Sequence, residues 1–82
     1  MTNEERAALD LYLTFEVGPH ASHFTAELYR LISKADSSNR RRLMEAFPLH
    51  VRMYEEWIHT EDRFAFFTKY NCQVNHKPGL TG

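Results

Sequence analysis

The chain has 82 residues, with ten Lys and Arg against eleven Asp and Glu, and 13% of its residues are aromatic. That length supports one domain, and a net charge of −1 argues against a dedicated nucleic-acid binder, which usually carries a basic excess. One cysteine excludes an internal disulfide, and no apolar run approaches the ~20 residues needed to span a membrane. Because the first ten residues also lack the basic and apolar regions of a signal peptide, we expect a cytoplasmic protein.

The first helix is expected over residues 3–17. Thr2 and Glu5 have the spacing of a capping box, and acidic residues in the first turn suit the helix dipole. Gly18 and Pro19 are typical of a helix end. The apolar face of this helix is wide and comprises Ala8, Leu9, Leu11, Tyr12, Leu13 and Phe15.

A second helix is expected over residues 22–35, because its apolar residues recur at the spacing of one buried stripe. That stripe comprises Phe24, Leu28, Leu31, Ile32 and Ala35. The sequence DSSN follows as a turn, and the side chains of Asp36, Ser37 and Ser38 can cap a third helix. The third helix is expected to direct Leu43, Met44 and Phe47 inward.

Pro48 is expected to begin a fourth helix, with a break at Phe47, because the residue before a proline disfavours the helical region. The fourth helix carries Val51, Tyr54 and Ile58 on one line, with Met53 and Trp57 beside it. Residues 60–62 restart the chain as a fifth helix, which carries Phe64, Phe66, Phe67 and Tyr70.

Helical periodicity is lost from Cys72 onward, and no alternating strand pattern occurs anywhere. The sequence therefore predicts an all-α protein: a compact bundle of four to five short helices over residues 1–71, followed by a flexible C-terminal tail over residues 72–82.

Three consecutive arginines, Arg40, Arg41 and Arg42, fall in or near the first turn of the third helix, where a cation costs roughly 0.3–1 kcal/mol against the dipole. One interpretation is a solvated run paired with nearby carboxylates. The other is recognition of an acidic group, to which the planar guanidinium is suited. On the second interpretation, Arg40, Arg41, Arg42 and Arg52 supply charged recognition of a partner protein, with Tyr54 and Trp57 as aromatic anchors.

Other classes of function find weaker support. Helices two and three could form a helix-turn-helix, but their turn has no glycine and nearby glutamates dilute the positive field. A zinc site could be formed by His20, His23, Cys72 and His76, but their spacings differ from those of strong zinc motifs. No catalytic motif is present, so we expect no enzyme activity and no cofactor.

The aromatic residues outnumber the positions that one core face can take, because neighbouring residues such as Phe66 and Phe67 differ by about 100° around a helix. Either the helices wrap several sides of a bundle, or a partner covers the surplus aromatic residues. On the second interpretation we expect a homodimer through a face that carries Phe64, Phe67 or Trp57.

Residues 28–58 contain Lys34-Ala35-Asp36, Asn39-Arg40 followed by Leu43, Phe47-Pro48, and Tyr54 with Trp57. This combination resembles small uncharacterised proteins of bacteriophages and prophages, which share such a KAD turn, an N-R-x-x-L helix start, an FP break and a Y-x-x-W helix. The resemblance covers under half of the chain. It implies an accessory protein in a bacterial host cytoplasm that binds a host protein and inhibits or redirects it, for example a component of CRISPR or another defence system.

Overall fold

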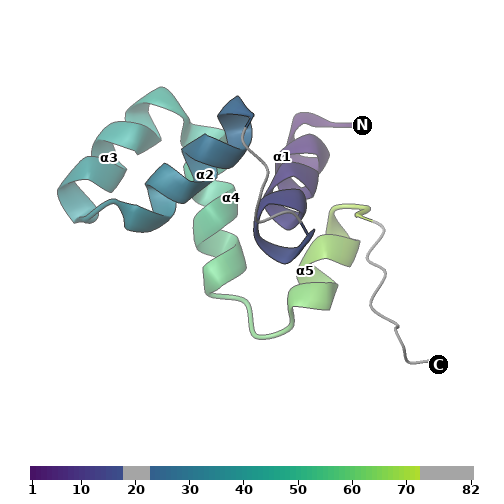
Figure 1. Cartoon of the computed structure of the whole chain (residues 1–82). Helices are drawn as coiled ribbons and strands as arrows, with labels where there is room; N and C mark the ends of the chain where they lie inside the picture. Colours follow the sequence, from purple (N-terminus) through teal and green to yellow (C-terminus); the bar gives the residue numbers. More distant parts are fainter. Residues whose placement is uncertain (18–22, 73–82) are drawn as a thin grey trace.

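The computed structural model describes residues 1–17 and 23–72, and within these ranges every regular element is a helix (Figure 1). The elements are α1 (Asn3–Tyr12), η1 (Leu13–Val17), α2 (Phe24–Lys34), α3 (Ser37–Ala46), α4 (Pro48–Ile58) and α5 (Arg63–Lys69). The predicted all-α bundle of short helices is confirmed. The predicted helix end at Gly18 and Pro19, the start at Ser22, and all of the predicted tail beyond Cys72 lie outside the described residues.

The N-terminal helix begins with the predicted capping box. The Thr2 hydroxyl accepts from the Glu5 amide at 3.0 Å, and the Glu5 carboxylate accepts from the Thr2 amide at 3.0 Å. The last five residues of the predicted helix, Leu13–Val17, form the π-helical segment η1. The spacing of the apolar residues does not predict this change from α-helix to π-helix. Within η1 the Thr14 hydroxyl donates to the Asp10 carbonyl at 2.7 Å, and both residues are buried. A widened turn is thus stabilised by a side-chain hydrogen bond to the backbone.

The buried side of α2 differs from the predicted stripe. Leu28 and Ile32 are buried as expected, but Phe24 and Leu31 are 67% and 52% exposed, so the prediction is wrong for these two. Tyr29 is fully buried instead, and its hydroxyl donates to the Ala7 carbonyl at 2.7 Å. This hydrogen bond to α1 fixes the rotation of α2, because a buried hydroxyl must find a partner.

The link from α2 to α3 is short, and α3 begins earlier than predicted. Asp36 is the N-cap, and its Oδ1 accepts from the Asn39 amide at 2.8 Å. Helical geometry starts at Ser37, so Arg40 is the fourth helical residue. The arginine run therefore lies in the second turn, where the dipole acts weakly on a cation.

The break between α3 and α4 falls at Phe47 as predicted, with φ −135° and ψ 62°, and Pro48 is the first residue of α4. On α4 the buried residues are Val51, Met53, Tyr54 and Trp57. The prediction that Ile58 continues the buried line is wrong, because Ile58 is 41% exposed at the end of the helix.

The start of α5 is capped by Asp62, whose Oδ1 accepts from the Ala65 amide at 3.1 Å. Its end is a Schellman motif: Asn71 has φ 63°, its amide donates to Thr68, and the Cys72 amide donates to the Phe67 carbonyl at 2.9 Å. Cys72, predicted to start the tail, is thereby folded back and is only 9% exposed.

One core joins α1, α2, α4 and α5. Its largest fully buried side chains are Tyr29, Phe67, Leu11, Ile32 and Val51. In contrast, α3 buries no residue, and its Leu43 and Met44 are only partly buried against the core. Leu43, Met44 and Phe47 thus point inward as predicted, but they cover the core rather than form it.

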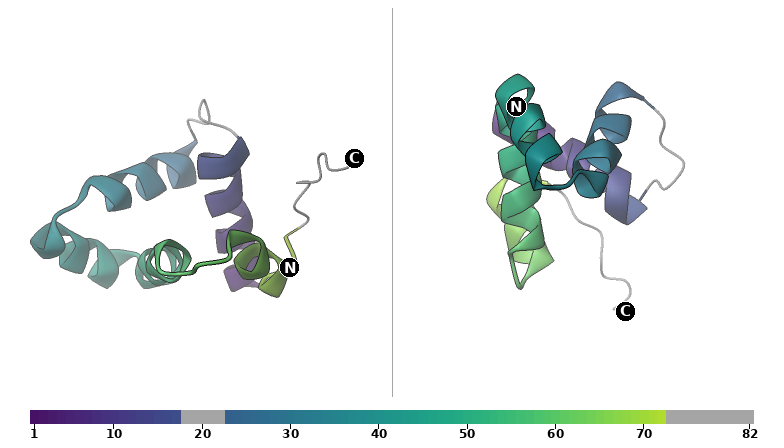
Figure 2. Two further views of the ribbon diagram at one scale, coloured as in Figure 1. Left: turned by 90° about the horizontal axis from the view of Figure 1, so that it is seen from below. Right: turned by 90° about the vertical axis from the view of Figure 1, so that its left-hand side faces the viewer.

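The arrangement explains this difference. In Figure 1, α3 lies at one end of the molecule, and α1 and α5 lie at the other, with α4 between them. Figure 2 (left) shows α2 and α3 running apart from the short turn that joins them, with α4 seen nearly end-on at the far end of α3. As a result, α3 packs mainly against α4.

Candidate functional site

The three consecutive arginines have different environments. Arg40 is partly buried, and its Nη2 donates to the carbonyls of Ile32 and Ala35 at 3.2 and 3.4 Å, at the end of α2. Its guanidinium also lies 5.5 Å from the centre of the Tyr54 ring. Nη1 is 4.0 Å from the Glu55 carboxylate. Arg40 therefore caps α2 and connects it to α3 and α4, which is a structural role.

Arg41 and Arg42 are exposed on α3. Arg42 donates from Nη1 to the Asn39 side chain at 3.1 Å, an exposed contact within its own helix. Arg52 is exposed on α4. Within residues 1–17 and 23–72, the side chains of Arg41 and Arg52 form no ion pair or hydrogen bond. Their guanidinium donors are thus available to an external acceptor.

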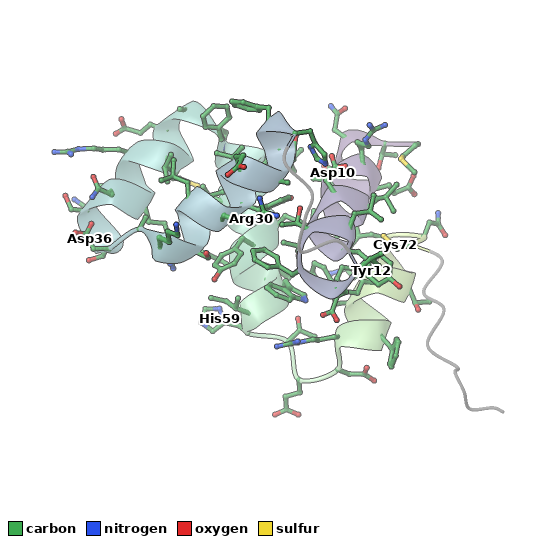
Figure 3. All side chains as sticks on the ribbon, viewed as in Figure 1. Asp10, Tyr12, Arg30, Asp36, His59 and Cys72 are labelled. Carbon is green, nitrogen blue, oxygen red and sulfur yellow. The ribbon has the colours of Figure 1, made fainter. Side chains whose placement is uncertain are left out.

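An open hollow adjoins Arg41, where the end of α2, α3 and α4 meet. It has a volume of about 550 Å³ and is lined by Ala35, Ser37, Arg40, Arg41, Met44 and Glu55. In Figure 3, Asp36, the cap of α3, lies at the outer tip of this end of the molecule. The hollow combines a thioether, two guanidinium groups and one carboxylate, which suits a polar protein segment better than an enclosed small molecule.

Tyr54 and Trp57, predicted as anchors for a partner, lie in the core at 8% and 7% exposed. The Trp57 ring stacks on Phe15, with centroids 5.1 Å apart and planes at 14°. Arg63 also contacts this ring, with its guanidinium 4.9 Å from the ring centre and 3.4 Å from the Glu16 carboxylate. Both aromatic rings are therefore occupied within the fold.

A second surface, on the α2 side of α3, was missed by the sequence reasoning. A hollow of about 210 Å³ is lined by Phe24, Glu27, Leu28, Leu31, Leu43 and Phe47. A neighbouring hollow of about 290 Å³ is lined by Leu31, Lys34, Ala35, Asn39, Arg42 and Leu43. We call these two hollows together the α2–α3 groove. No spacing signal marks this groove, because Phe24 and Leu31 face outward only as a result of the hydrogen bond from Tyr29 to Ala7 of α1.

The histidines do not assemble around a metal in the part of the chain that the structure describes, where no group of three or more His, Cys, Asp or Glu could hold one. His20 and His76 of the hypothetical zinc site lie outside that part. His23 instead caps α2, since its Nδ1 accepts from the Ala26 amide at 3.4 Å. Burial raises the pKa of the Cys72 thiol, with the Glu5 charge adding to the effect.

His50 and His59 also have structural environments. His50 packs against the Tyr29 ring, with centroids 5.5 Å apart. Burial lowers the pKa of His50, and the negative charge of Asp10 opposes that shift only in part. His59 lies at the end of α4, where its Nδ1 is 2.8 Å from the Glu55 carbonyl.

Opposite the arginines, Glu56 joins α4 to α5. Its carboxylate accepts from Lys69 Nζ at 2.7 Å and from the Tyr70 hydroxyl at 2.8 Å. The hydrogen bond from Lys69 is the main cause that lowers the pKa of Glu56. This partly exposed cluster joins two helices by side-chain contacts, so we assign it to stability.

Among the described residues, no helix is long and apolar enough to cross a membrane. No protein-family model, curated protein or solved structure matches this chain.

Proposed function

We propose that the chain is a small, non-enzymatic protein of bacteriophage type that binds a bacterial host protein and inhibits or redirects it in the host cytoplasm. A component of a defence system, such as CRISPR, is one target of this kind. The binding surface is formed by Arg41 and Arg52 and by the hollow beside Arg41, and it faces an acidic region of the partner. The resemblance of residues 28–58 to phage and prophage proteins supports the phage context.

One observation carries the proposal. Within the described residues, Arg41 and Arg52 are exposed and have no carboxylate partner, whereas every other arginine there forms an ion pair or a hydrogen bond. Arginine is among the residues enriched where interfaces gain most of their affinity. Its fork of donors matches a carboxylate in two-point geometry. Tyr54 and Trp57 are not included in this surface, because the core holds them.

DNA remains the competing ligand, because α3 buries no residue and carries exposed arginines. Three features favour protein over DNA. Arg40 is used inside the fold, Glu45 lies exposed on the same helix, and the chain as a whole is slightly negative. Non-specific DNA affinity comes mostly from a concentrated positive field, which this surface lacks.

The test is affinity capture from bacterial lysate with the wild-type chain, the double variant Arg41→Gln/Arg52→Gln, and Arg6→Gln as control. Arg6 is also exposed, but it lies on α1 and pairs with Asp10 at 3.5 Å. We expect one host protein to co-purify with the wild type and with the control, and to be lost with the double variant. Loss of interface charge pairs commonly costs about 2–5 kcal/mol, which removes most capture at micromolar concentration.

A gel-shift titration of duplex DNA against salt separates the competing function. We expect only weak duplex binding that is unchanged in the double variant. Sequence-dependent shifts that fall steeply with salt and disappear in Arg41→Gln/Arg52→Gln would replace the proposal with DNA binding. Host-protein capture that survives the double change would also refute it.

A further inference from the structure

The α2–α3 groove has an apolar floor and wall that the described residues leave open. Phe24 and Leu31 are the exposed apolar side chains of α2. They lie seven residues apart, so they share one side of the helix. Leu43 and Phe47 face them from the other side of the groove, and the Phe24 and Phe47 rings are 5.9 Å apart between centroids. The two hollows share Leu31 and Leu43, so they form one continuous strip.

Charge is distributed unevenly along this strip. Glu27 lines the hollow near the start of α2, whereas Lys34 and Arg42 line the hollow near its end. Glu27 and Lys34 are also seven residues apart, so both flank the line of Phe24 and Leu31 on the same side of the helix. The strip therefore has one acidic end and one basic end, with its most exposed leucine between them.

This distribution is complementary to itself. A two-fold axis near Leu31 would place α2 antiparallel to α2 of a second copy, so that the acidic end of each chain meets the basic end of the other. Glu27 of each chain then faces Lys34 of the other, and the two Leu31 side chains meet at the axis. Among the described residues, Glu27 pairs with Arg30 of its own helix at 3.5 Å, a surface contact that exchanges easily.

We propose that the α2–α3 groove is the interface of a symmetric homodimer, with Leu31 at its centre and Glu27–Lys34 pairs at its two ends. This interface adjoins the hollow of the proposed host-binding surface, since Ala35 lines both, but it uses neither Arg41 nor Arg52. It differs from the face predicted from sequence, of which Phe67 and Trp57 are buried in the core at 1% and 7% exposed, whereas Phe64 is 42% exposed on α5. A chain of this size gains from such an interface, since small domains bury little of their own surface.

The test is sedimentation equilibrium of the full chain over a wide concentration range. We expect a reversible dimer for the wild type, and Leu31→Glu to remain monomeric with an unchanged helical spectrum. Ile58→Glu is the matched control, because Ile58 is also apolar and 41% exposed but lies at the end of α4. This control should still dimerise. A wild-type chain that stays monomeric throughout, or dimerisation by Leu31→Glu, overturns the proposal.

Charge exchange tests the two-fold geometry itself. Glu27→Lys and Lys34→Glu should each weaken self-association by roughly tenfold, because each creates two like-charge contacts in the dimer. An equimolar mixture of the two variants should recover wild-type association as a heterodimer, in which both contacts are again opposite in charge. Failure of the mixture to recover association would contradict the antiparallel arrangement, whereas host-protein capture by these variants should be unaffected.

Discussion

At the end of the molecule formed by α1, η1, α4 and α5, aromatic rings contact one another within and beside the core. Phe15 stacks on Trp57, and Tyr12 meets Phe67 edge-on, with ring centroids 5.1 Å apart in each pair. At the other end, on α2 and α3, Phe24 and Leu31 lie on the surface and α3 buries nothing. Figure 3 places Tyr12 and Cys72 at the first end and Asp36 at the second.

The difference teaches that similar residues serve different purposes at the two ends. The aromatic end stabilises the fold, since its rings pack against one another within the chain. The α2–α3 end is held by contacts of α2 with α1 and α4 and by Arg40, and it leaves apolar and cationic groups exposed. Substitutions at the two ends should therefore differ in how much they lower the free energy of unfolding.

The largest effect is expected from Trp57→Ala. Removing a buried aromatic side chain costs about 3–5 kcal/mol of unfolding free energy, a large share of what a small domain has. The measurement is urea denaturation of dilute protein, followed by circular dichroism. Phe24→Ala serves as the matched change at the other end, where 67% exposure should keep the loss within about 0.5 kcal/mol. Equal losses from the two substitutions would remove the distinction between the ends.

Arg40→Gln should have an intermediate effect. It removes two hydrogen bonds to the last carbonyls of α2, each contributing about 0.5–1.5 kcal/mol, so the expected loss is about 1–3 kcal/mol. Arg41→Gln, its neighbour on α3, should leave the melting temperature unchanged. If the two variants melt alike, Arg40 belongs with the solvated arginines after all.

A smaller effect should come from His50 at the junction of the two ends. Its pKa is lowered by burial, so the unfolded chain takes up a proton before the folded chain does as pH falls through the ordinary value of 6.5. Stability should therefore decrease on acidification through that value. The negative charge of Asp10 opposes the shift in the His50 pKa. The pKa of Glu56 is also lowered, but the stability that its ionised form contributes is lost only at lower pH. Thermal melts between about pH 7.5 and 5.5 should show a larger fall in melting temperature for the wild type than for His50→Gln.

Much of the fold could be predicted from local sequence chemistry. The capping box at Thr2 and the break before Pro48 depend on residues close in the chain, and both are confirmed. The orientation of α2 could not be predicted, because it depends on the Tyr29 hydroxyl reaching the Ala7 carbonyl, 22 residues away. Without that contact, Phe24 and Leu31 are indistinguishable from core residues by spacing alone.

The candidate site was predicted only in part, for a similar reason. Spacing cannot separate Arg40 from Arg41, yet one guanidinium lies against the end of α2 and the other is exposed. Trp57 on α4 looked available for a partner because Phe15, on which its ring stacks, is distant in sequence. These are tertiary contacts, which periodicity does not encode.

The contrast between the two ends can be measured most directly by native-state hydrogen exchange at a concentration where the chain is monomeric. The account predicts that the amides of Tyr29, Val51 and Trp57 exchange only through global unfolding, since these residues are buried in the shared core. Amides in the second half of α3, such as those of Met44 and Glu45, should exchange through a smaller opening that leaves the core intact. Protection of α3 equal to that of α4 would contradict the account, because α3 would then be part of the same cooperative core.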